Sequence, residues 1–364
     1  MDYVMLKDVC SINMGQSPDS NSYNDEGIGV PFFQGNADFG KRYPVTRKWC
    51  SAPTKMAASE DILISVRAPI GAMNYAKEDC CIGRGLAALT PNKAKVSPEF
   101  IFWLLKGKNA ELNSKGTGST FKAIGRKVLE ETLVPNLPLE KQLEYSEILE
   151  RVYGVIQARK EELQKLDELI KARFVEMFGD ENNSKNWDVV NVEEVADVQV
   201  GVVIKPSQYY TDKSEGVRTF RSLNIGAGFI KDIDWVYFTK EGHQKNSKSI
   251  LKKDDLLIVR SGAPGTACVV TEEYAGCNAV DIIIAHPDCK KVNPYYLCTF
   301  TNMPHGKKQI DEGIGGAAQQ HFNVGKYNKL QLMLPPKALQ DEFVGFVKQV
   351  NKSKVVVSNT LYYN

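Results

Sequence analysis

With 364 residues and a hydrophobic content of 43%, the chain is long enough for about two globular domains. Its net charge of +2 means that any contact with nucleic acid must come from local basic patches and not from bulk charge. The eight cysteines form no CxxC pair, which argues against a zinc site and a disulfide framework. The chain starts without an apolar signal core and contains no apolar run of about 18 residues, so we expect a cytoplasmic protein.

The first half of the chain predicts a mixed α/β unit. Short β-branched and aromatic runs bounded by turn residues, such as residues 62–66, predict strands. Ser97 and Pro98 precede Phe100 and Trp103 as the cap and first turn of an amphipathic helix. A Gly-rich loop follows from Lys115, and the unit ends in a helix.

The longest predicted helix covers residues 139–178, which contain no Pro and one Gly. Its apolar residues follow a heptad pattern that is typical of a coiled-coil seam, although two arginines weaken it. The two seam positions carry Leu149, Ile156, Leu163, Ile170 and Met177, and Tyr145, Val152, Arg159, Leu166 and Arg173. At ~1.5 Å per residue the helix is a rod of roughly 60 Å, which favours a spacer over an ordinary core helix.

The second half repeats the first in the same order, which indicates a tandem duplication of one unit of roughly 190 residues. The offset between partners grows from 186 to 198 through small insertions, so we expect both halves to share one fold. The matched residues are Leu6, Val9, Ile12 and Gly15 with Val192, Val195, Val198 and Gly201; Phe32, Asn36 and Gly40 with Phe220, Asn224 and Gly228; Asp61 with Asp255; Gly71 with Gly265; Pro98 with Pro294; and Gly118, Pro138 and Gln142 with Gly316, Pro336 and Gln340.

The second unit also ends in a helix, predicted from Lys337 to about Leu361. It has no counterpart of residues 167–178, so we expect the spacer to be incompletely paired there. Two like helices in one chain can pair as an antiparallel coiled coil, which would place the units at opposite ends about a pseudo-two-fold axis. The residues expected to pair the helices are Leu149, Val152, Ile156, Leu163, Leu166, Ile170, Phe343, Val347 and Val350.

The predicted fold class is therefore α/β (α+β), with two similar domains separated by two long helices. We place the first domain at residues 1–138, the central helix at 139–178, the second domain at 186–335 and the shortened helix at 336–364.

Signatures of catalysis occur only in incomplete form. Residues 35–42 approach a phosphate-binding P-loop, but Arg42 stands where a Mg²⁺-binding Ser or Thr is required. Asn293-Pro-Tyr-Tyr resembles the tetrad of adenine methyltransferases, but its second Pro is missing and its repeat partner is a helix cap. The four histidines have no ligand spacing, so we expect neither catalytic residues nor a metal site in this chain.

Basic residues gather locally at residues 39–59, 106–127 and 240–253. A solvated charged face is the plain interpretation, but recurrence in both halves beside Gly-rich loops favours phosphate binding. Base edges are read by Arg, Asn, Gln, Ser and Thr side chains on loops. The expected DNA-binding residues are Gln34, Asn36, Lys41, Arg42, Arg67, Lys115, Ser119, Thr120, Lys122, Arg221, Asn224, Arg260, Gln319, Gln320 and His321.

Over its whole length the chain resembles the specificity (S) subunit of type I restriction–modification systems. The resemblance rests on the order and duplication of several segments and on no single motif. These are the opening segments at Leu6 and Val192, the strands Asp61-Ile-Leu-Ile-Ser and Asp255-Leu-Leu-Ile-Val, the loops Gly118-Ser-Thr-Phe-Lys and Gly316-Ala-Ala-Gln-Gln, and the two ends of the central helix, Leu137-Pro-Leu-Glu-Lys-Gln and Ala172-Arg-Phe-Val-Glu-Met-Phe-Gly.

The resemblance implies two target-recognition domains that each read one half of a split double-stranded DNA site, with two paired helices as a ruler between them. It implies no cofactor on this chain. Two methyltransferase (M) subunits would carry S-adenosylmethionine, restriction (R) subunits would use ATP and Mg²⁺, and no membrane is involved. Two alternatives stay open: a self-contained DNA methyltransferase without recognisable motifs, and a non-DNA scaffold of duplicated α/β modules.

Overall fold

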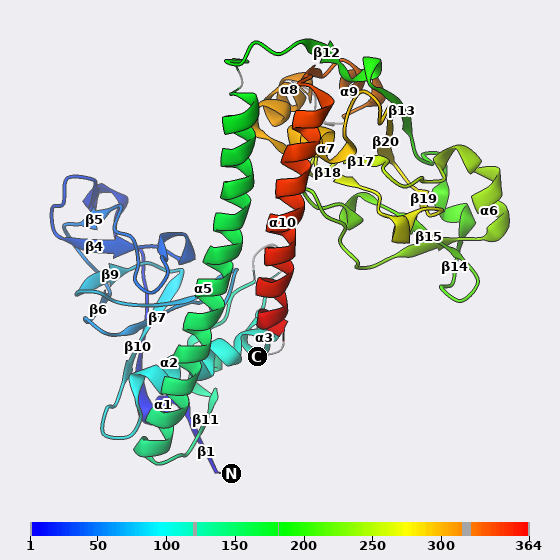
Figure 1. Cartoon of the computed structure of the whole chain (residues 1–364). Coiled ribbons are helices and arrows are strands. Elements are labelled where there is room, and N and C mark those ends of the chain that lie inside the picture. Colours follow the sequence, from blue (N-terminus) through cyan, green and yellow to red (C-terminus); the bar gives the residue numbers. More distant parts are fainter. Residues whose placement is uncertain (1, 119–121, 181, 315–321, 363–364) are drawn as a thin grey trace. The chain divides into compact units, whose positions relative to one another are not determined.

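The computed structural model describes residues 2–118, 122–180, 182–314 and 322–362 (Figure 1). The chain divides into two compact units, Met1–Gln157 and Ala158–Asn364. The boundary between them falls inside the long helix α5 (Leu139–Phe178), whose bounds are those expected from the sequence. Each unit is a mixed α/β structure, so the predicted fold class is confirmed.

The first unit contains two larger sheets and a short strand pair. The four-stranded sheet has the order β2-β10-β7-β8, with bounds Cys10–Met14, Leu86–Pro91, Ile62–Ser65 and Met73–Tyr75. The five-stranded sheet has the order β3-β5-β4-β9-β6, with bounds Tyr23–Asn24, Trp49–Cys50, Val30–Phe33, Cys80–Ile82 and Met56–Ala57. The strand pair joins β1 (Tyr3–Met5) to β11 (Leu133–Pro135).

The central strand β7 of the four-stranded sheet is buried on both faces, which explains its nearly continuous apolar sequence. In β7, Ile62 and Ile64 pack in a core with Phe100 of helix α2 (Pro98–Gly107). Leu63, on the opposite face, packs in a second core with Phe33 of the five-stranded sheet. Because side chains alternate along a strand, this one short strand supplies two cores, and each fully buried side chain is worth roughly 1.5–3 kcal/mol.

The remaining helices of the first unit are short. They are α1 (Leu6–Val9), α3 (Asn109–Ser114) and α4 (Arg126–Glu130). The Ser97 hydroxyl caps α2 by accepting from the backbone N–H of Phe100 at 3.3 Å, as the sequence predicted.

The second unit repeats this arrangement. Its four-stranded sheet has the order β13-β20-β17-β18, with bounds Ala196–Val200, Ile282–Pro287, Leu256–Val259 and Ala267–Val269. A second sheet has the order β14-β16-β15-β19, with bounds Tyr210–Thr211, Val236–Phe238, Val217–Phe220 and Asn278–Ala279, and β12 (Val189–Asn191) pairs with β21 (Gln331–Met333). The helices are α6 (Lys240–Lys245), α7 (Pro294–Asn302), α8 (Pro304–Ile314), α9 (Val324–Asn328) and α10 (Lys337–Tyr362).

Equivalent hydrogen bonds confirm the duplication at the level of single residues. Gln142 is 1% exposed, and its side-chain oxygen accepts from the backbone N–H of Ser97, the cap of α2, at 2.9 Å. Gln340 is 0% exposed and accepts from the N–H of Asn293, the cap of α7, at 2.8 Å. In both units the same glutamine therefore joins the terminal helix to the start of the helix that covers the sheet.

One part of the predicted alignment is wrong by two residues. The Oδ2 of Asp38 accepts from the backbone of Gln34 and Gly35, whereas the Oδ1 of Asn224 accepts from the backbone of Arg221. Both side chains close a single 3-10 turn, so Asp38 and not Asn36 is the counterpart of Asn224. The hairpins that follow agree, because Gly40 N–H donates to the Tyr43 carbonyl and Gly226 N–H to the Phe229 carbonyl.

The second half of α5 and α10 pack against each other in the second unit and run in opposite directions (Figure 1). Arg173 lies 3.2 Å from Glu342, and Asp167 bonds Lys354, so residue numbers fall along α5 as they rise along α10. Phe343 of α10 meets Phe174 edge-on at 5.5 Å between ring centroids.

The expectation that residues 167–178 would be unpaired is therefore wrong, because in an antiparallel pair the start of one helix lies against the end of the other. Phe174 and Phe178 are 0% exposed, whereas Leu149 and Val152 are 43% and 42% exposed. The exposed part of the predicted seam thus lies in the first half of α5.

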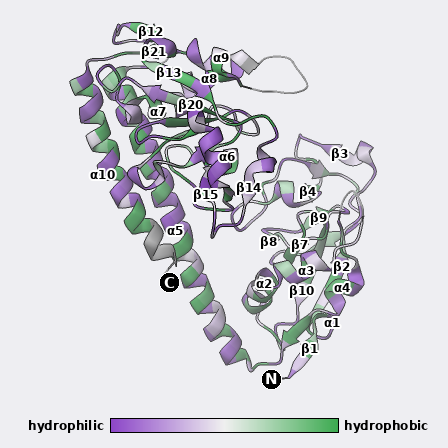
Figure 2. Ribbon diagram, turned by 90° about the vertical axis from the view of Figure 1, so that its right-hand side faces the viewer, coloured by the Kyte–Doolittle hydropathy of each residue, from purple (hydrophilic) through white to green (hydrophobic). Residues whose placement is uncertain are grey.

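The other residues predicted to pair the helices are at least half-buried. Ile156, Leu163, Leu166 and Ile170 are half-buried, and Phe343, Val347 and Val350 are buried. Hydrophilic and hydrophobic residues alternate along α5 in Figure 2, as expected of an amphipathic helix. Helix α5 ends before Gly179, whose φ of 89° lies in the left-handed region that favours glycine. The Gly179 N–H donates to the Val175 carbonyl.

Candidate nucleic-acid interface

In the first unit, a row of backbone hydrogen bonds brings together residues that are far apart in sequence. Gly85 N–H donates to the Gln34 carbonyl at 3.2 Å, Val66 N–H to the Gly85 carbonyl at 2.9 Å, and Ile124 N–H to the Val66 carbonyl at 2.9 Å. The row therefore joins the end of β4, the loop after β9, the end of β7 and the segment before α4.

Three of the predicted DNA-binding residues lie on this row or next to it, and all three are exposed. Gln34 is its first member, Arg67 follows Val66, and Lys122 bonds Ala68 through its carbonyl oxygen at 3.0 Å. Arg67 also forms a β-bridge with Ala123. We call these residues, with Arg84, the basic edge.

Arg84 was missed from the sequence. It is exposed and lies between Gly83 and Gly85, so it occupies the centre of the basic edge. The Gly-Arg-Gly tripeptide at residues 83–85 was the sequence feature that could have pointed to Arg84. A Cβ at Gly85 would lie 2.3 Å from the Gln34 oxygen, and one at Gly83 would lie 3.1 Å from the Gln34 Cα. The glycines therefore allow the loop after β9 to lie directly against the end of β4.

The other candidates of the first unit are more dispersed. Asn36 is half-buried and begins the 3-10 turn that Asp38 closes. Lys41 is exposed at the tip of the following hairpin. Lys115 is exposed and lies 2.6 Å from Glu111, which also pairs with Lys108 at 2.7 Å. Hydrogen bonds from Lys108 and then Lys115 lower the pKa of Glu111 to about 2, so both lysines share one carboxylate.

Arg42 is committed to a contact within the unit. Its Nη1 lies 2.6 Å from Oε1 of Glu150 on α5, and this hydrogen bond raises the pKa of the guanidinium. Its expected DNA contact would therefore require that ion pair to break.

The corresponding part of the second unit carries different side chains. Val280 N–H donates to the Phe220 carbonyl at 2.9 Å, and Phe322 N–H donates to the Arg260 carbonyl at 3.0 Å. Leu86 pairs with Ser65 and Ile282 with Val259, so Val280 stands at the position of Arg84 and Asp281 at that of Gly85. The exposed base of the first unit is thus replaced by an apolar residue, and an acid follows it.

The candidate arginines of the second unit are each held by an acid. Arg260 bonds Asp281, and its side chain is 17% exposed. Arg221 lies 3.2 Å from Asp234 and also bonds the Asp234 carbonyl. Both side chains retain some exposure, and their charge is largely balanced locally.

Asn224 is not available to a ligand. It is 0% exposed, its Oδ1 accepts from the Arg221 N–H at 2.9 Å, and its Nδ2 donates to the Ile233 carbonyl at 2.6 Å. Its function is to hold the loop, so we remove it from the expected DNA-binding residues. Ser119, Thr120, Gln319, Gln320 and His321 lie outside the described residues.

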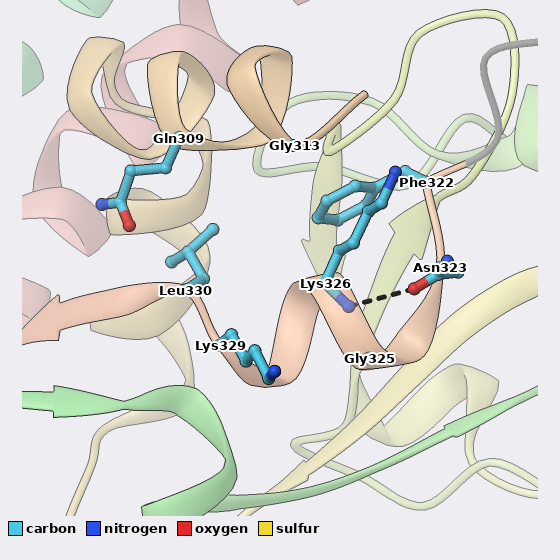
Figure 3. Close-up of a pocket in the computed structure, with 8 residues that line it drawn as sticks. All are labelled: Gln309, Gly313, Phe322, Asn323, Gly325, Lys326, Lys329 and Leu330. Carbon is cyan, nitrogen blue, oxygen red and sulfur yellow. Dashed lines mark hydrogen bonds between the residues drawn. The ribbon is translucent and has the colours of Figure 1, made fainter. Parts of the chain in front are cut away.

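A pocket of about 400 Å³ lies between α8 and α9 (Figure 3). Its polar side chains complete the local backbone. Gln309 both donates to and accepts from the backbone of Gln331, at 3.1 and 2.9 Å, and Asn323 accepts from the N–H of Lys326 at 3.0 Å. We therefore assign Gln309 to the support of β21 and Asn323 to the cap of α9, and neither to a ligand.

The titratable groups offer little reaction chemistry. Among the described residues, no group of three or more His, Cys, Asp and Glu side chains is placed to hold a metal ion. All eight cysteines are free thiols, and burial raises the pKa of Cys10 and Cys80 to about 12. No described helix is long and apolar enough to cross a membrane.

Comparison with known proteins places the chain in a family. The model of the family described as type I restriction modification DNA specificity domain matches twice, at residues 1–168 and 184–361. A putative specificity subunit of the type I restriction enzyme MjaX from Methanocaldococcus jannaschii is 44% identical over 160 residues, which cover 44% of this chain and 38% of that protein. The chain thus spans well under half the length of this relative.

Two further relatives are similar over nearly the whole chain. The EcoBI specificity subunit of Escherichia coli is 19% identical over 95% of this chain and 78% of its own length. The solved structure of an S subunit from M. genitalium has a TM-score of 0.56 at 14% identity and covers 100% of this chain and 92% of that one, which supports the fold. Specificity subunits are a non-catalytic class of type I restriction–modification proteins. With both halves matched by the family model, the chain belongs to the type I restriction modification DNA specificity domain family.

Proposed function

We propose that this chain is the DNA sequence-recognition subunit of a type I restriction–modification complex and reads a split site with two domains, at residues 1–138 and 186–335. One observation carries the proposal: corresponding sheet edges in the two units of a family member present unlike side chains. Two such edges suit an asymmetric site, because unlike side chains recognise unlike bases.

The basic edge supplies the groups of the first reader. Arg67, Arg84 and Lys122 provide positive charge for phosphates or guanines, and Gln34 provides an amide that suits adenine. Lys41 and Lys115 add charge elsewhere in the first unit. In the second reader, Arg221 and Arg260 are paired with acids, so binding DNA would exchange a carboxylate partner for a phosphate or base.

The helices at residues 139–178 and 336–364 are the spacer in this proposal. A recognition subunit needs no cofactor of its own. Its partners would be double-stranded DNA, two methyltransferase subunits that carry S-adenosylmethionine, and restriction subunits that use ATP and Mg²⁺, all in the cytoplasm.

Methylome sequencing of the host with and without this chain tests the proposal. We expect removal of the chain to abolish adenine methylation at one motif made of two short sequences with an unspecified gap. A methylome that does not change on removal would contradict the proposal.

A salt titration separates DNA recognition from the scaffold alternative. For duplex DNA the logarithm of the binding constant falls with the logarithm of salt concentration, with a slope of about −0.9 for each phosphate contacted. A complex that contains this chain should show a steep slope, and a protein scaffold should show none.

A further inference from the structure

In the first unit, Arg42 ties the tip of the hairpin after β4 to α5. Besides its ion pair with Glu150, its guanidinium lies over the ring of Tyr75 at 5.1 Å. The backbone N–H of Tyr75 donates to the Arg42 carbonyl at 2.9 Å. Arg42 is thus held through both its side chain and its backbone.

A series of aromatic contacts leads from Tyr75 to the same helix. Tyr75 stacks on Phe102 of α2 at 4.7 Å, and the neighbouring Trp103 meets Tyr153 of α5 edge-on at 5.2 Å. Lys106 places its ammonium 3.9 Å from the centre of the Tyr153 ring, close enough for a cation–π interaction.

Glu150 and Tyr153 are three residues apart, so they lie on one face of α5. The hairpin, β8, α2 and α5 therefore form a closed set of contacts, which we call the clamp. Its members are Arg42, Tyr75, Phe102, Trp103, Lys106, Glu150 and Tyr153.

The clamp is specific to the first unit, although the Gln142 and Gln340 contacts occur in both. Where the first unit has Arg42 and Glu150, the equivalent positions of the second hold Gly228 and Lys348, which cannot form an ion pair. The other five clamp positions differ as well. The counterparts of Tyr75, Phe102, Trp103, Lys106 and Tyr153 are, in that order, Val269, Cys298, Thr299, Asn302 and Asn351, which have neither an aromatic ring nor an ammonium group.

We propose that the clamp fixes the orientation of the first recognition domain on α5 and so sets the gap between the two half-sites, with Arg42 as a positioning residue. The proposal rests on the proposed function. A second contact, that of Gln142, lies near the start of α5, so loss of the clamp would let the domain tilt about that end of the helix. Successive base pairs are about 3.4 Å apart, so a tilt that moves the reading edge by this distance shifts the half-site by one base pair.

Selection from a pool of randomised DNA duplexes, with the full chain as bait, measures the half-sites and the gap together. The variants are Arg42→Gln, Glu150→Gln and the exchange Arg42→Glu with Glu150→Arg. Glu147→Gln is the matched control, because Glu147 pairs with Arg151 on the exposed face of the same helix.

We expect the wild-type chain and the control to select one gap length. Arg42→Gln and Glu150→Gln should both keep the two half-site sequences and add a second gap length, and the exchange should restore the single length. A merely stabilising ion pair would not change the gap.

Two results would overturn the proposal. If Arg42→Gln alone changed the first half-site or lowered the salt slope by about 0.9 while Glu150→Gln had no effect, Arg42 would be a DNA contact. If neither variant changed the gap, the clamp would not set it. Failure of the wild-type chain to select any split motif would instead count against the proposed function, and the gap-setting role would fall with it.

Hydrogen exchange of the free chain tests the clamp without DNA. Glu150→Gln should speed exchange of the Tyr75 amide and of the hairpin at residues 38–45 by roughly threefold, the effect of losing one partly exposed ion pair, and Glu147→Gln should not. Equal exchange in the two variants would show that Arg42 does not hold the hairpin.

Discussion

Single residues of the basic edge define what the first reader can recognise. Arg84 is exposed at the centre of this edge, between two glycines that allow the chains to approach closely. It was not predicted from the sequence, because its place depends on the hydrogen bonds that the neighbouring Gly85 makes with Gln34 and Val66, which are distant in the chain.

Replacing Arg84 by Ala should weaken DNA binding and reduce the salt slope by about 0.9, because one phosphate-neutralising charge is removed. If Arg84 reads a guanine, the loss should be confined to one base of the first half-site. Fluorescence anisotropy at several salt concentrations measures both quantities.

Lys93→Ala is the control for this experiment, since the Lys93 side chain is 68% exposed and pairs with Glu60. Equal slopes for the Arg84 and Lys93 variants would remove Arg84 from the interface.

Gly85 supports the same edge through its lack of a side chain. A Cβ 2.3 Å from the Gln34 oxygen cannot be accommodated without moving backbone, so Gly85→Ala should lower the free energy of unfolding by about 1–3 kcal/mol. Chemical denaturation of the full chain measures the change. Gly107→Ala is the comparison, because nothing lies within 4 Å of its added carbon, and a loss as large as that of Gly85→Ala would contradict the steric explanation.

At the scale of elements, the order of strands and helices and the antiparallel pairing of the long helices were predictable, but the register of that pairing was not. Apolar runs such as residues 62–65 and the repeated order of segments identified two units with the same sheet order. The heptad pattern identified α5 but did not show which part of it α10 covers, because that depends on the register between the two helices.

Matching identical residues also gave a wrong alignment between the loop after β4 and its counterpart in the second unit. Asn36 appeared to match Asn224, yet Asp38 performs the equivalent capping. Asp and Asn close such turns with the same oxygen, so identity was a poor guide to equivalence there.

The buried glutamines provide a test at the level of elements. Gln142→Ala and Gln340→Ala should each lower the free energy of unfolding of their own unit by about 1–3 kcal/mol, because each leaves a helix-cap N–H and two carbonyls without their side-chain partner. Hydrogen exchange resolves the two units. Lys141→Ala, on the exposed face, should have little effect, and destabilisation of both units by either glutamine variant would contradict the assignment.

At the scale of the whole molecule, one unit occurs twice on a chain with a long helix, and the two copies differ at the surface proposed to read DNA. The duplication, the family and the fold could be predicted from the sequence. The contacting residues could be predicted only in part: Gln34, Arg67 and Lys122 lie together as candidates, whereas Asn224 is buried in a supporting role.

The most direct test of the two-reader proposal is to replace residues 1–138 with the corresponding segment of another specificity subunit and to sequence the methylome of the host. We predict that one half of the methylated motif changes to the half read by the donor segment, while the other half is retained. A motif that changes in both halves, or in neither, would contradict the assignment of one reader to each unit.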